Sequence, residues 1–333
     1  MSHLPRIAIT MGDPAGVGPE ICLHLLANEA IAAVCTPIVF GDARILWRCA
    51  RQLSLPPPKR ILSEIDWPEV AATVDQPAVL DVYGFDAAAF EPGTVSAATG
   101  GAAYRYVERS IEAALAGQVA AVSTAPLNKE AMHAAGIKFP GHTEIFATKM
   151  NAARSCMLQY SDEVRASFVT THCGYGEVPG LLTVQRILDV IELTAEAMKK
   201  IRTPRPKLGV LGLNPHAGEH GLFGNREEEN IIIPAMELAR ARGIDVEGPF
   251  PPDTAFLPAR RRSTDAFICM YHDQGHIPLK ALAFDVAVNT TLGLPIVRTS
   301  VDHGTACDIA WQGKASPNSL FEAVKMAVKL GQI

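Results

Sequence analysis

The sequence predicts an α/β protein whose sheet is largely parallel. Short apolar runs rich in β-branched residues alternate with longer stretches in which apolar residues recur every three or four positions. Hydrophobic residues make up 48% of the 333 residues and charged residues 20%, which is the balance of a folded protein with a sizeable core. A chain of this length is expected to form two lobes or one large domain.

Seven short runs are expected to form strands. They cover residues 6–10, 37–40, 119–124, 166–171, 207–213, 266–271 and 296–300. The clearest helix follows the fourth run, and its apolar face consists of Val184, Ile187, Leu188, Ile191, Ala195 and Met198. A last helix is expected to begin at Ser319, which has Glu322 three residues later as in a capping box, and to end at Gly331.

Charge and termini argue against several classes of protein. The formal net charge is −5, whereas nucleic-acid binding needs a basic face, and we expect the one basic cluster, Arg260–Arg262, to lie in a solvated loop. No apolar run approaches the roughly 18 residues of a membrane helix, and the amino terminus lacks the pattern of a secretory signal. Seven scattered cysteines without a CxxC pair indicate reduced thiols. We therefore expect a cytoplasmic protein that binds neither nucleic acid nor membrane.

Three histidines, His172, His216 and His272, each follow the end of an expected strand within a few residues. Ligands of open α/β sheets gather beyond the carboxyl ends of the strands, and three imidazoles with an open position form a common catalytic zinc site. We therefore expect a shared divalent metal, zinc first, with cobalt, nickel, manganese and magnesium as alternatives. The competing interpretation is that each histidine makes a separate hydrogen bond at its own strand end.

Two glycine-rich loops are candidates for ligand contact. TMGDPAGVGPEI (10–21) joins a strand to a helix that has Pro19 at its start and Glu20 in its first turn. It is not the GxGxxG fingerprint, so a conventional Rossmann site is not expected. NPHAGEHGLFG (214–224) follows a strand and precedes a helix, and its backbone N–H groups suit a phosphate or a ribose. Plain turns are the alternative for both loops.

A third region carries groups that suit anions. Lys280, Asn289 and Arg298 each lie in or beside an apolar stretch, which favours a role in binding phosphate or carboxylate oxygens. His142 and Thr143 follow a Pro-Gly turn, where local turn hydrogen bonds are the alternative. The residues alone thus predict an enzyme with a histidine-bound metal and an anion pocket, and they leave hydride transfer and hydrolysis open.

Four motifs closely resemble segments of one family. MGDPAGVGPE, NPHAGE, MYHDQGH and TLGLPIVRTSVDHGTACDIA are similar to the 4-hydroxythreonine-4-phosphate dehydrogenase family of the vitamin B6 pathway, which in turn resembles isocitrate and isopropylmalate dehydrogenases. The resemblance covers nearly the whole chain. It implies a two-lobed α/β/α fold with residues 1–130 plus 286–333 in lobe 1, and residues 131–285 with most metal and substrate residues in lobe 2. It also implies a homodimer with active sites at the interface and metal ligands from both subunits.

The resemblance also assigns roles to individual residues. It places the metal ligands at His172, His216 and His272. It places substrate contacts at His142, Thr143, Lys280, Asn289 and Arg298. It places cofactor contacts at Gly218, Glu219, His303, Gly304, Thr305 and Asp308. The implied catalytic residues are Lys280, Asp253 and Asp273, of which Asp273 is also suited to orienting a histidine.

The implied reaction oxidises the C3 hydroxyl of the phosphorylated amino acid with NAD or NADP, and the β-keto acid that forms then loses CO2. The metal would stabilise negative charge on oxygen, while Lys280 and Arg298 would hold anionic groups. The expected partners are therefore a phosphorylated small-molecule substrate, a nicotinamide cofactor and a divalent metal.

Two positions depart from the family pattern. His276 and Ile277 in YHDQGHIPLK resemble a branch that acts on 4-phospho-D-threonate or 4-phospho-D-erythronate, which lack the amino group. Trp311 stands where related dehydrogenases prefer a small, glycine-like residue. A branch that oxidises aromatic cis-dihydrodiol carboxylates ranks third. Outside the family, the competing hypotheses are a metal-dependent hydrolase or aldolase and a metabolite-binding protein without catalysis.

Overall fold

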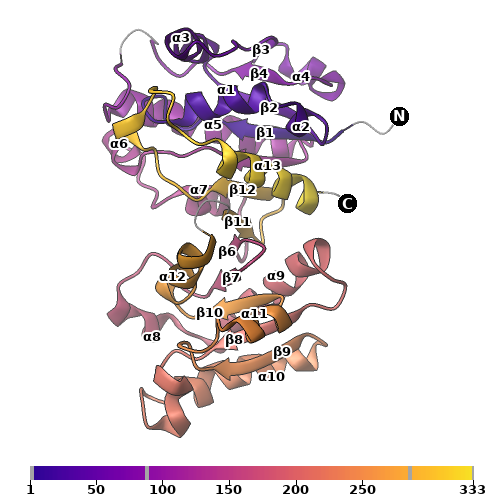
Figure 1. The fold of residues 1–333 in the computed structure, drawn as a ribbon, viewed down its shortest axis with the longest axis vertical. Helices are drawn as coiled ribbons and strands as arrows, with labels where there is room; N and C mark the ends of the chain where they lie inside the picture. Colours follow the sequence, from indigo (N-terminus) through magenta and orange to yellow (C-terminus); the bar gives the residue numbers. More distant parts are fainter. Residues whose placement is uncertain (1–3, 87–89, 284–286, 332–333) are drawn as a thin grey trace. The chain divides into compact units, whose positions relative to one another are not determined.

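The computed structural model describes residues 4–86, 90–283 and 287–331. The chain forms two compact units, shown in Figure 1. Unit 1 comprises Met1–Ala152 and Leu294–Ile333, and unit 2 comprises Ala153–Gly293. In both units strands and helices alternate along the chain, so the expected α/β class is confirmed.

The boundaries of the two units differ from the expected lobes 1–130 plus 286–333 and 131–285. The helices α6 (Lys129–Ala134) and α7 (His142–Lys149) belong to unit 1 because Met132 and Phe146 are buried in its core. The strand β11 (Val288–Leu292) belongs to unit 2 because it pairs with β6 (Cys156–Tyr160). His142 and Thr143, which we expected in the second lobe, therefore lie in unit 1.

Unit 1 contains a parallel sheet in the order β3-β4-β2-β1-β5-β12. Its strands are β1 (Arg6–Thr10), β2 (Thr36–Gly41), β3 (Ile61–Ser63), β4 (Ala78–Asp81), β5 (Ala121–Thr124) and β12 (Val297–Val301). Every residue of β2 and β5 is buried, as expected for parallel strands that are covered on both faces. The strand β12, near the carboxyl end of the chain, thus pairs with β5.

The helices of unit 1 pack against this sheet and against each other. They are α1 (Gly18–Leu26), α2 (Glu29–Ala32), α3 (Ala43–Leu53), α4 (Trp67–Val70), α5 (Ala97–Leu115), α6, α7 and α13 (Asn318–Gly331), with short 3-10 turns at Ala71–Thr73 and Cys307–Ile309. The long helix α5 contacts β1, β2 and β5, and α13 contacts β12 and β5. The last helix, α13, begins one residue before Ser319 and ends at Gly331, as expected.

Unit 2 contains strands in the order β11-β6-β7-β10-β8-β9. Besides β6 and β11, its strands are β7 (Arg165–Phe168), β8 (Lys207–Leu211), β9 (Asp245–Phe250) and β10 (Ala266–Cys269). β7, β10, β8 and β9 are parallel, whereas β6 is antiparallel to both of its neighbours. A tight turn joins β6 to β7, in which the N–H of Ser161 donates to the carbonyl of Val164 and the N–H of Val164 donates to the side-chain oxygen of Ser161.

The helices of unit 2 cover both faces of these strands. They are α8 (Val178–Leu181), α9 (Val184–Ile201), α10 (Ile233–Ala241), α11 (Pro258–Ser263) and α12 (His272–Ala283). Shorter elements are a 3-10 turn at Tyr175–Glu177, a left-handed turn within Pro215–Gly221 and a π-helical turn at Glu228–Ile232. Thr194 of α9 bonds Ser167 of β7, whereas Gly275 of α12 packs against Phe168. Because neighbouring strand residues point to opposite faces, α9 and α12 lie on opposite sides of β7.

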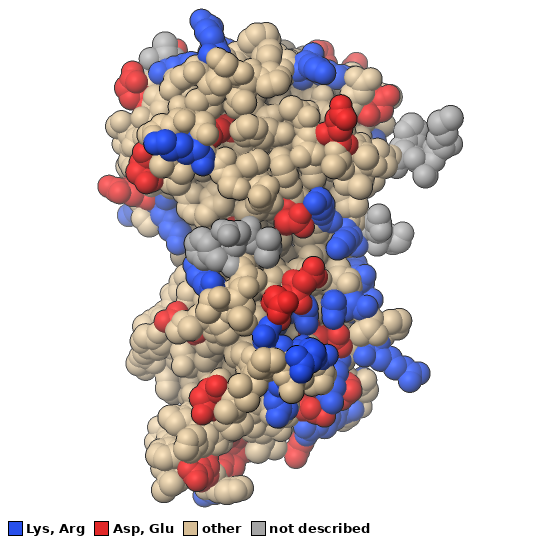
Figure 2. Space-filling view, viewed as in Figure 1, with Lys and Arg blue, Asp and Glu red and all other residues tan. Residues whose placement is uncertain are grey.

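Two expectations about local structure are wrong. Arg260–Arg262 lie in the helix α11 and not in a loop; Arg260 stacks on the ring of Phe250, and Arg261 pairs with Glu163. The runs 166–171, 207–213 and 266–271 leave the strand conformation two residues or more before their ends. On the face in Figure 2, Lys and Arg side chains are interspersed with Asp and Glu. Across the described ranges, no helix has the length and apolarity needed to cross a membrane.

Candidate functional site

Two of the three candidate metal ligands lie together in unit 2. His172 follows β7 and His272 begins α12 just after β10, and these parallel strands are neighbours, so their carboxyl ends meet. The two ring centroids are 5.9 Å apart. Two imidazoles that each bind one metal through a single nitrogen place their centroids about 5 to 6 Å apart, given metal–nitrogen bonds of about 2.0–2.1 Å. The His172–His272 pair therefore fits one metal ion.

Hydrogen bonds at Asp273 define which nitrogen of His272 faces the solvent. The Nδ1 of His272 lies 2.7 Å from one oxygen of Asp273, and the hydroxyl of Tyr175 donates to the other oxygen. These two bonds, that of Tyr175 first, lower the pKa of Asp273. An ionised carboxylate at Nδ1 holds the proton there and leaves the Nε2 lone pair available to a metal. Tyr175 was not among the predicted residues, because its only signal is its place three positions after His172.

This histidine pair borders a hollow of about 410 Å³ in unit 2, a size that is ordinary for small-molecule sites. Ten residues line it: Thr171, His172, Cys173, Gly174, Tyr175, Glu177, Val178, Tyr271, His272 and Asp273. Its lining comes from the segments that follow β7 and β10. The hollow therefore occupies the end of the sheet where ligands of α/β proteins bind.

His276 lies one helical turn after His272 and is buried, with 6% of its surface exposed. Its ring stacks on that of His272 at a centroid distance of 3.8 Å and an angle of 10°. Burial lowers the pKa of His276 to about 4, so the ring is neutral at ordinary pH. The buried side chain of Gln159 contacts its Nε2.

Other predicted residues of unit 2 lie near this group or away from it. Asn289 of β11 faces Gln159 of β6 across the antiparallel pair, and among the described residues none bonds its shielded Oδ1. Lys280 is exposed on α12, one turn after His276, and its charge acts on that ring. Asp253 lies exposed in the turn between β9 and α11. Asn289 thus lies next to Gln159, and Lys280 lies near His276.

Unit 1 holds a buried cationic group around Arg298 of β12. Arg298 is 2% exposed, its Nη2 donates to Thr124 Oγ1 over 2.8 Å, and its guanidinium lies over the ring of Phe146. Burial lowers the pKa of Arg298 to about 9, and Glu144 opposes part of that shift. Burial also lowers the pKa of His142, and the positive charges of Arg298 and Lys129 lower it further.

The same group contains an unsatisfied buried atom. The Nε2 of His142 is shielded from solvent, and no described residue forms a hydrogen bond with it. Buried polar groups are normally paired, and a buried guanidinium is stabilised by a carboxylate or phosphate. His142 and Arg298, two of the predicted substrate residues, therefore form a site that suits an anion.

The predicted cofactor segment of unit 1 packs against the first glycine-rich loop. The N–H of Val17 donates to the carbonyl of Thr305 over 3.0 Å, and a Cβ on Gly16 would lie 2.7 Å from the same oxygen. Glu20, buried in α1, accepts from the N–H groups of Gly313 and Ala315. Glu20 therefore holds the carboxyl-terminal segment, a role that its helix-terminal position did not predict. The predicted contacts His303, Gly304, Thr305 and Asp308 all lie in this segment.

Trp311 occupies a backbone conformation that favours glycine. Its φ is +56°, its side chain is buried, and its Nε1 donates to the carbonyl of Pro14 over 3.1 Å. The ring also packs edge-on against Phe90. A glycine-like residue at this position in related dehydrogenases would take this φ without a steric cost, whereas Trp311 fills the space behind the first loop.

The loop at 214–224 contains a left-handed turn. Five consecutive residues, His216 to His220, have φ between 42° and 78°, and only Gly218 among them is a glycine. Asn214 before the turn donates to Glu227 and Glu228, and Glu228 also accepts from the N–H groups of Leu213 and Asn214. Each non-glycine residue in this region costs about 1–2 kcal/mol. Such strain persists where the surroundings enforce it, often at functional sites.

His216, the third predicted metal ligand, lies exposed in this turn with its Nδ1 3.1 Å from Glu219. Within residues 4–86, 90–283 and 287–331, no three His, Cys, Asp or Glu side chains are arranged around one metal position. The chain by itself thus brings together two of its three predicted ligands. Gly218 and Glu219, predicted to contact the cofactor, lie in the same turn as His216.

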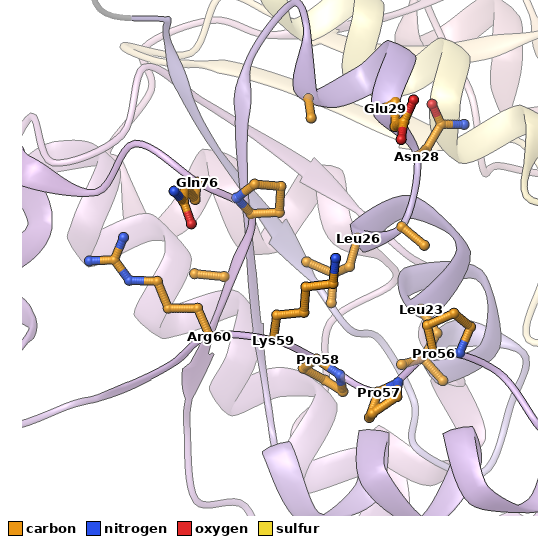
Figure 3. A pocket seen from close by; sticks show the side chains of 14 residues that line it. Leu23, Leu26, Asn28, Glu29, Pro56, Pro57, Pro58, Lys59, Arg60 and Gln76 are labelled. Atoms are coloured by element: carbon orange, nitrogen blue, oxygen red, sulfur yellow. The ribbon is translucent and has the colours of Figure 1, made fainter.

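A second cavity lies elsewhere in unit 1 and is shown in Figure 3. It has a volume of about 460 Å³, and Leu23 and Leu26 of α1, the Pro56–Pro58 segment and Lys59 contribute to its lining. It borders the amino end of β4, at Ala78, and none of the predicted site residues lines it. It is therefore separate from the candidate site.

Histidines near the carboxyl ends of parallel strands, a buried guanidinium and glycine-rich loops are features of α/β enzymes that act on small anionic molecules. Residues 33–327 match the family of the pyridoxal phosphate biosynthetic protein PdxA, and the chain belongs to this family. It is an NAD(P)-dependent dehydrogenase of the type found there.

Two relatives are about equally similar and carry different names. A 4-hydroxythreonine-4-phosphate dehydrogenase of Desulforapulum autotrophicum is 45% identical over 97% of this chain and 94% of its own. A D-threonate 4-phosphate dehydrogenase of Cupriavidus necator is 45% identical over 98% of both chains. The crystal structure of a 4-hydroxythreonine-4-phosphate dehydrogenase from Klebsiella pneumoniae is 42% identical and superposes with a TM-score of 0.85, covering 98% of this chain and 100% of that one.

Proposed function

We propose that the enzyme oxidises the C3 hydroxyl of 4-phosphohydroxy-L-threonine with NAD(P) and a divalent metal, zinc first. The hydride passes from C3 to the nicotinamide and the hydroxyl proton to a base. The β-keto acid then loses CO2 as the C1–C2 bond breaks, and protonation at C2 gives 3-amino-2-oxopropyl phosphate. The spacing of His172 and His272, which suits one metal ion, is the observation that carries the proposal.

The metal, when bound, supplies a positive charge that stabilises the oxygen at C3 as negative charge develops. His172 and His272 hold it, and Asp273 keeps the proton of His272 on Nδ1. Because both oxygens of Asp273 are engaged by His272 and Tyr175, we assign it to orientation rather than proton transfer. Lys280 is the first candidate for the base, with Asp253 second.

Arg298, His142 and Thr143 are the proposed contacts for the anionic groups of the substrate, together with Lys280 and Asn289. An anion next to Arg298 would offset the cost of its burial, and it would give the Nε2 of His142 a partner. Binding energy at the phosphate would then position C3, which is how remote binding accelerates the chemical step.

We propose a homodimer in which the metal ligands come from both subunits. His172 and His272 of one chain leave coordination positions open, and His216 lies in a strained, exposed turn. His216 of the partner subunit then completes the set. The neighbouring Gly218 and Glu219, with His303, Gly304, Thr305 and Asp308, are the proposed contacts for NAD or NADP.

A second substrate is favoured by the motif YHDQGHIPLK. His276 and Ile277 resemble the branch that acts on 4-phospho-D-threonate or 4-phospho-D-erythronate, and the Cupriavidus necator relative is named for the first of these. The chemistry is the same, because these acids also carry a C3 hydroxyl and a C4 phosphate.

The test is nicotinamide reduction by the purified, metal-loaded enzyme with each of the three substrates. We expect reduction that a chelator abolishes and that added zinc restores. Preference for the amino acid supports the first substrate, and preference for either sugar acid supports the second. If nicotinamide is reduced with none of them, the proposal is wrong, and a dihydrodiol substrate or a hydrolase or aldolase reaction becomes the better hypothesis.

A further inference from the structure

Gln159 and His276 form a buried polar pair next to His272, between the start of α12 and the sheet. Gln159 of β6 is 1% exposed, and its Nε2 lies 3.3 Å from the Nε2 of His276 in α12. The Nδ1 of His276 lies 3.0 Å from the backbone carbonyl of His272. Phe168 of β7 stacks on one face of the His276 ring at 4.5 Å, and the ring of His272 stacks on His276 at 3.8 Å.

These contacts define where the proton of His276 lies. A carbonyl oxygen only accepts, so Nδ1 of His276 must carry the proton. The amide nitrogen of Gln159 only donates, so Nε2 must be the acceptor. Both ring nitrogens are therefore used inside the protein by a neutral ring, and neither is left to contact a substrate.

The start of α12 is held rigidly around this ring. Gln274 accepts from the N–H of Met270 over 2.7 Å and donates to the carbonyl of Gly212 over 2.8 Å, which ties the helix to the ends of β10 and β8. Gly275 allows the helix to approach β7 closely, because a Cβ there would lie 2.7 Å from the ring of Phe168. The backbone that carries His272 is thus fixed, and its ring is fixed by His276 and Asp273.

We propose that Gln159 and His276 are positioning residues that set the plane of the His272 ring for the metal. This inference rests on the proposed metal-binding role of His272. The pair acts in two ways. The ring of His276 stacks on that of His272 and limits rotation of the His272 side chain. The bond from His276 Nδ1 to the carbonyl of His272 ties the ring of His276 to the first turn of α12. Groups that orient a ligating histidine typically change metal affinity by about 10–100-fold when removed.

The inference gives His276 a role that differs from substrate selection. If the residue marks the branch that acts on sugar acids, it does so through the position of His272 and not through a hydrogen bond to the substrate. Loss of the pair should therefore weaken metal binding while it leaves the relative preference for amino-acid and sugar-acid substrates unchanged.

The test uses the full-length enzyme and two variants, Gln159→Leu and His276→Phe. Gln159→Leu removes the donor to Nε2, and His276→Phe keeps a stacking ring but removes both nitrogens. Thr194→Val is the matched control, because it deletes a buried hydrogen bond to Ser167 on the opposite face of β7. We would measure the zinc dissociation constant by chelator competition, the melting temperature, and the tautomer of His276 by ¹⁵N NMR of histidine-labelled, metal-free protein.

We expect His276 to carry its proton on Nδ1 in the wild type and to hold it there less strongly in Gln159→Leu, where only the backbone carbonyl of His272 still selects Nδ1. Both variants should raise the zinc dissociation constant about 10–100-fold, whereas Thr194→Val should lower only the melting temperature. His272→Ala separates a failure of the proposed metal site from a failure of the positioning role. If His272→Ala binds zinc like the wild type, the proposed metal site itself is wrong. If it loses zinc but Gln159→Leu and His276→Phe bind zinc normally, the metal site stands and the positioning role is overturned.

Discussion

The two units hold their functional side chains in opposite ways. In unit 1, Arg298, His142 and Lys129 place positive charge or potential positive charge together, and burial opposes the charge of the first two. In unit 2, Asp273 contacts the Nδ1 of His272, and the backbone carbonyl of His272 and the amide of Gln159 contact the two ring nitrogens of His276. Unit 1 therefore presents buried positive charge that suits an anionic ligand, whereas unit 2 presents side chains whose orientation is already fixed by hydrogen bonds and stacking.

This difference teaches which property each unit should control. A buried cationic site is stabilised by the anion that it binds, so substitutions there should change substrate affinity and pH dependence. Metal-binding side chains that are already oriented add little to the stability of the fold. Substitutions there should therefore change metal affinity and turnover.

The largest effect is expected at the metal-binding pair. His172→Ala and His272→Ala should each lower turnover roughly 1,000-fold or more, because the charge next to the C3 oxygen is lost. His172 is exposed and His272 is only partly buried, so the free energy of unfolding should change by about 1 kcal/mol or less. Turnover and urea unfolding of each variant check this, and His133→Ala, on α6 of unit 1, is the control. Normal turnover in metal-stripped wild type would contradict the role of the pair.

A smaller loss is expected from Arg298→Lys in unit 1. The variant keeps the charge but loses the planar donor fork, which is worth about 1.5–3 kcal/mol at a charged group, so KM should rise about 10–100-fold with little change in kcat. Arg165→Lys in unit 2 is a matched control, since Arg165 is equally buried but donates to backbone carbonyls. Steady-state kinetics and thermal unfolding should show a loss of substrate affinity in the first variant and a loss of stability in the second. The reverse pattern would contradict the comparison of the two units.

A pH effect on stability is expected from His142. Its pKa is lowered in the folded protein, while the unfolded chain titrates near the usual value of about 6.5. Below that value the unfolded state binds the extra proton first, so the contribution of His142 is complete above pH 6.5 and is lost as the pH falls. His142→Asn should therefore flatten the fall in unfolding free energy between about pH 6.5 and 5, which urea titrations at several pH values would show. An unchanged slope would mean that His142 is not shielded from solvent.

The sequence predicted those parts of the fold whose apolar pattern is uninterrupted. The helix at 184–198 has one obvious apolar face, and 6–10 and 37–40 are largely apolar runs. The elements α9, β1 and β2 lie there. The strands β6 and β11 were missed because polar residues such as Gln159 and Asn289 interrupt their apolar runs. Those residues point to the side of α12, and their place in a strand becomes intelligible only once that helix is known.

The sequence indicated only part of the candidate site. Of the three histidines predicted to share a metal, His172 and His272 lie together because their strands are neighbours in a parallel sheet. Tyr175 and Gln159 were not predicted, because each acts through a partner far away in the sequence. The left-handed turn at His216–His220 was also unexpected, since only one of its residues is a glycine. Contacts and backbone strain of this kind depend on tertiary structure that spacing along the chain does not encode.

The smallest effect separates two kinds of positive φ, one in each unit. Ser54 ends α3 in the left-handed conformation on the surface of unit 1, and Ala217 adopts it within the turn of unit 2 that carries His216. Ser54→Gly and Ala217→Gly should each raise the free energy of unfolding by up to about 1 kcal/mol, because glycine adopts this conformation without a steric cost. Ser54→Gly should leave activity unchanged. Ala217→Gly should lower zinc affinity, because the turn that carries His216 becomes more flexible and holds this ligand less firmly. Equal zinc affinity in both variants would mean that the strain in unit 2 serves the fold alone.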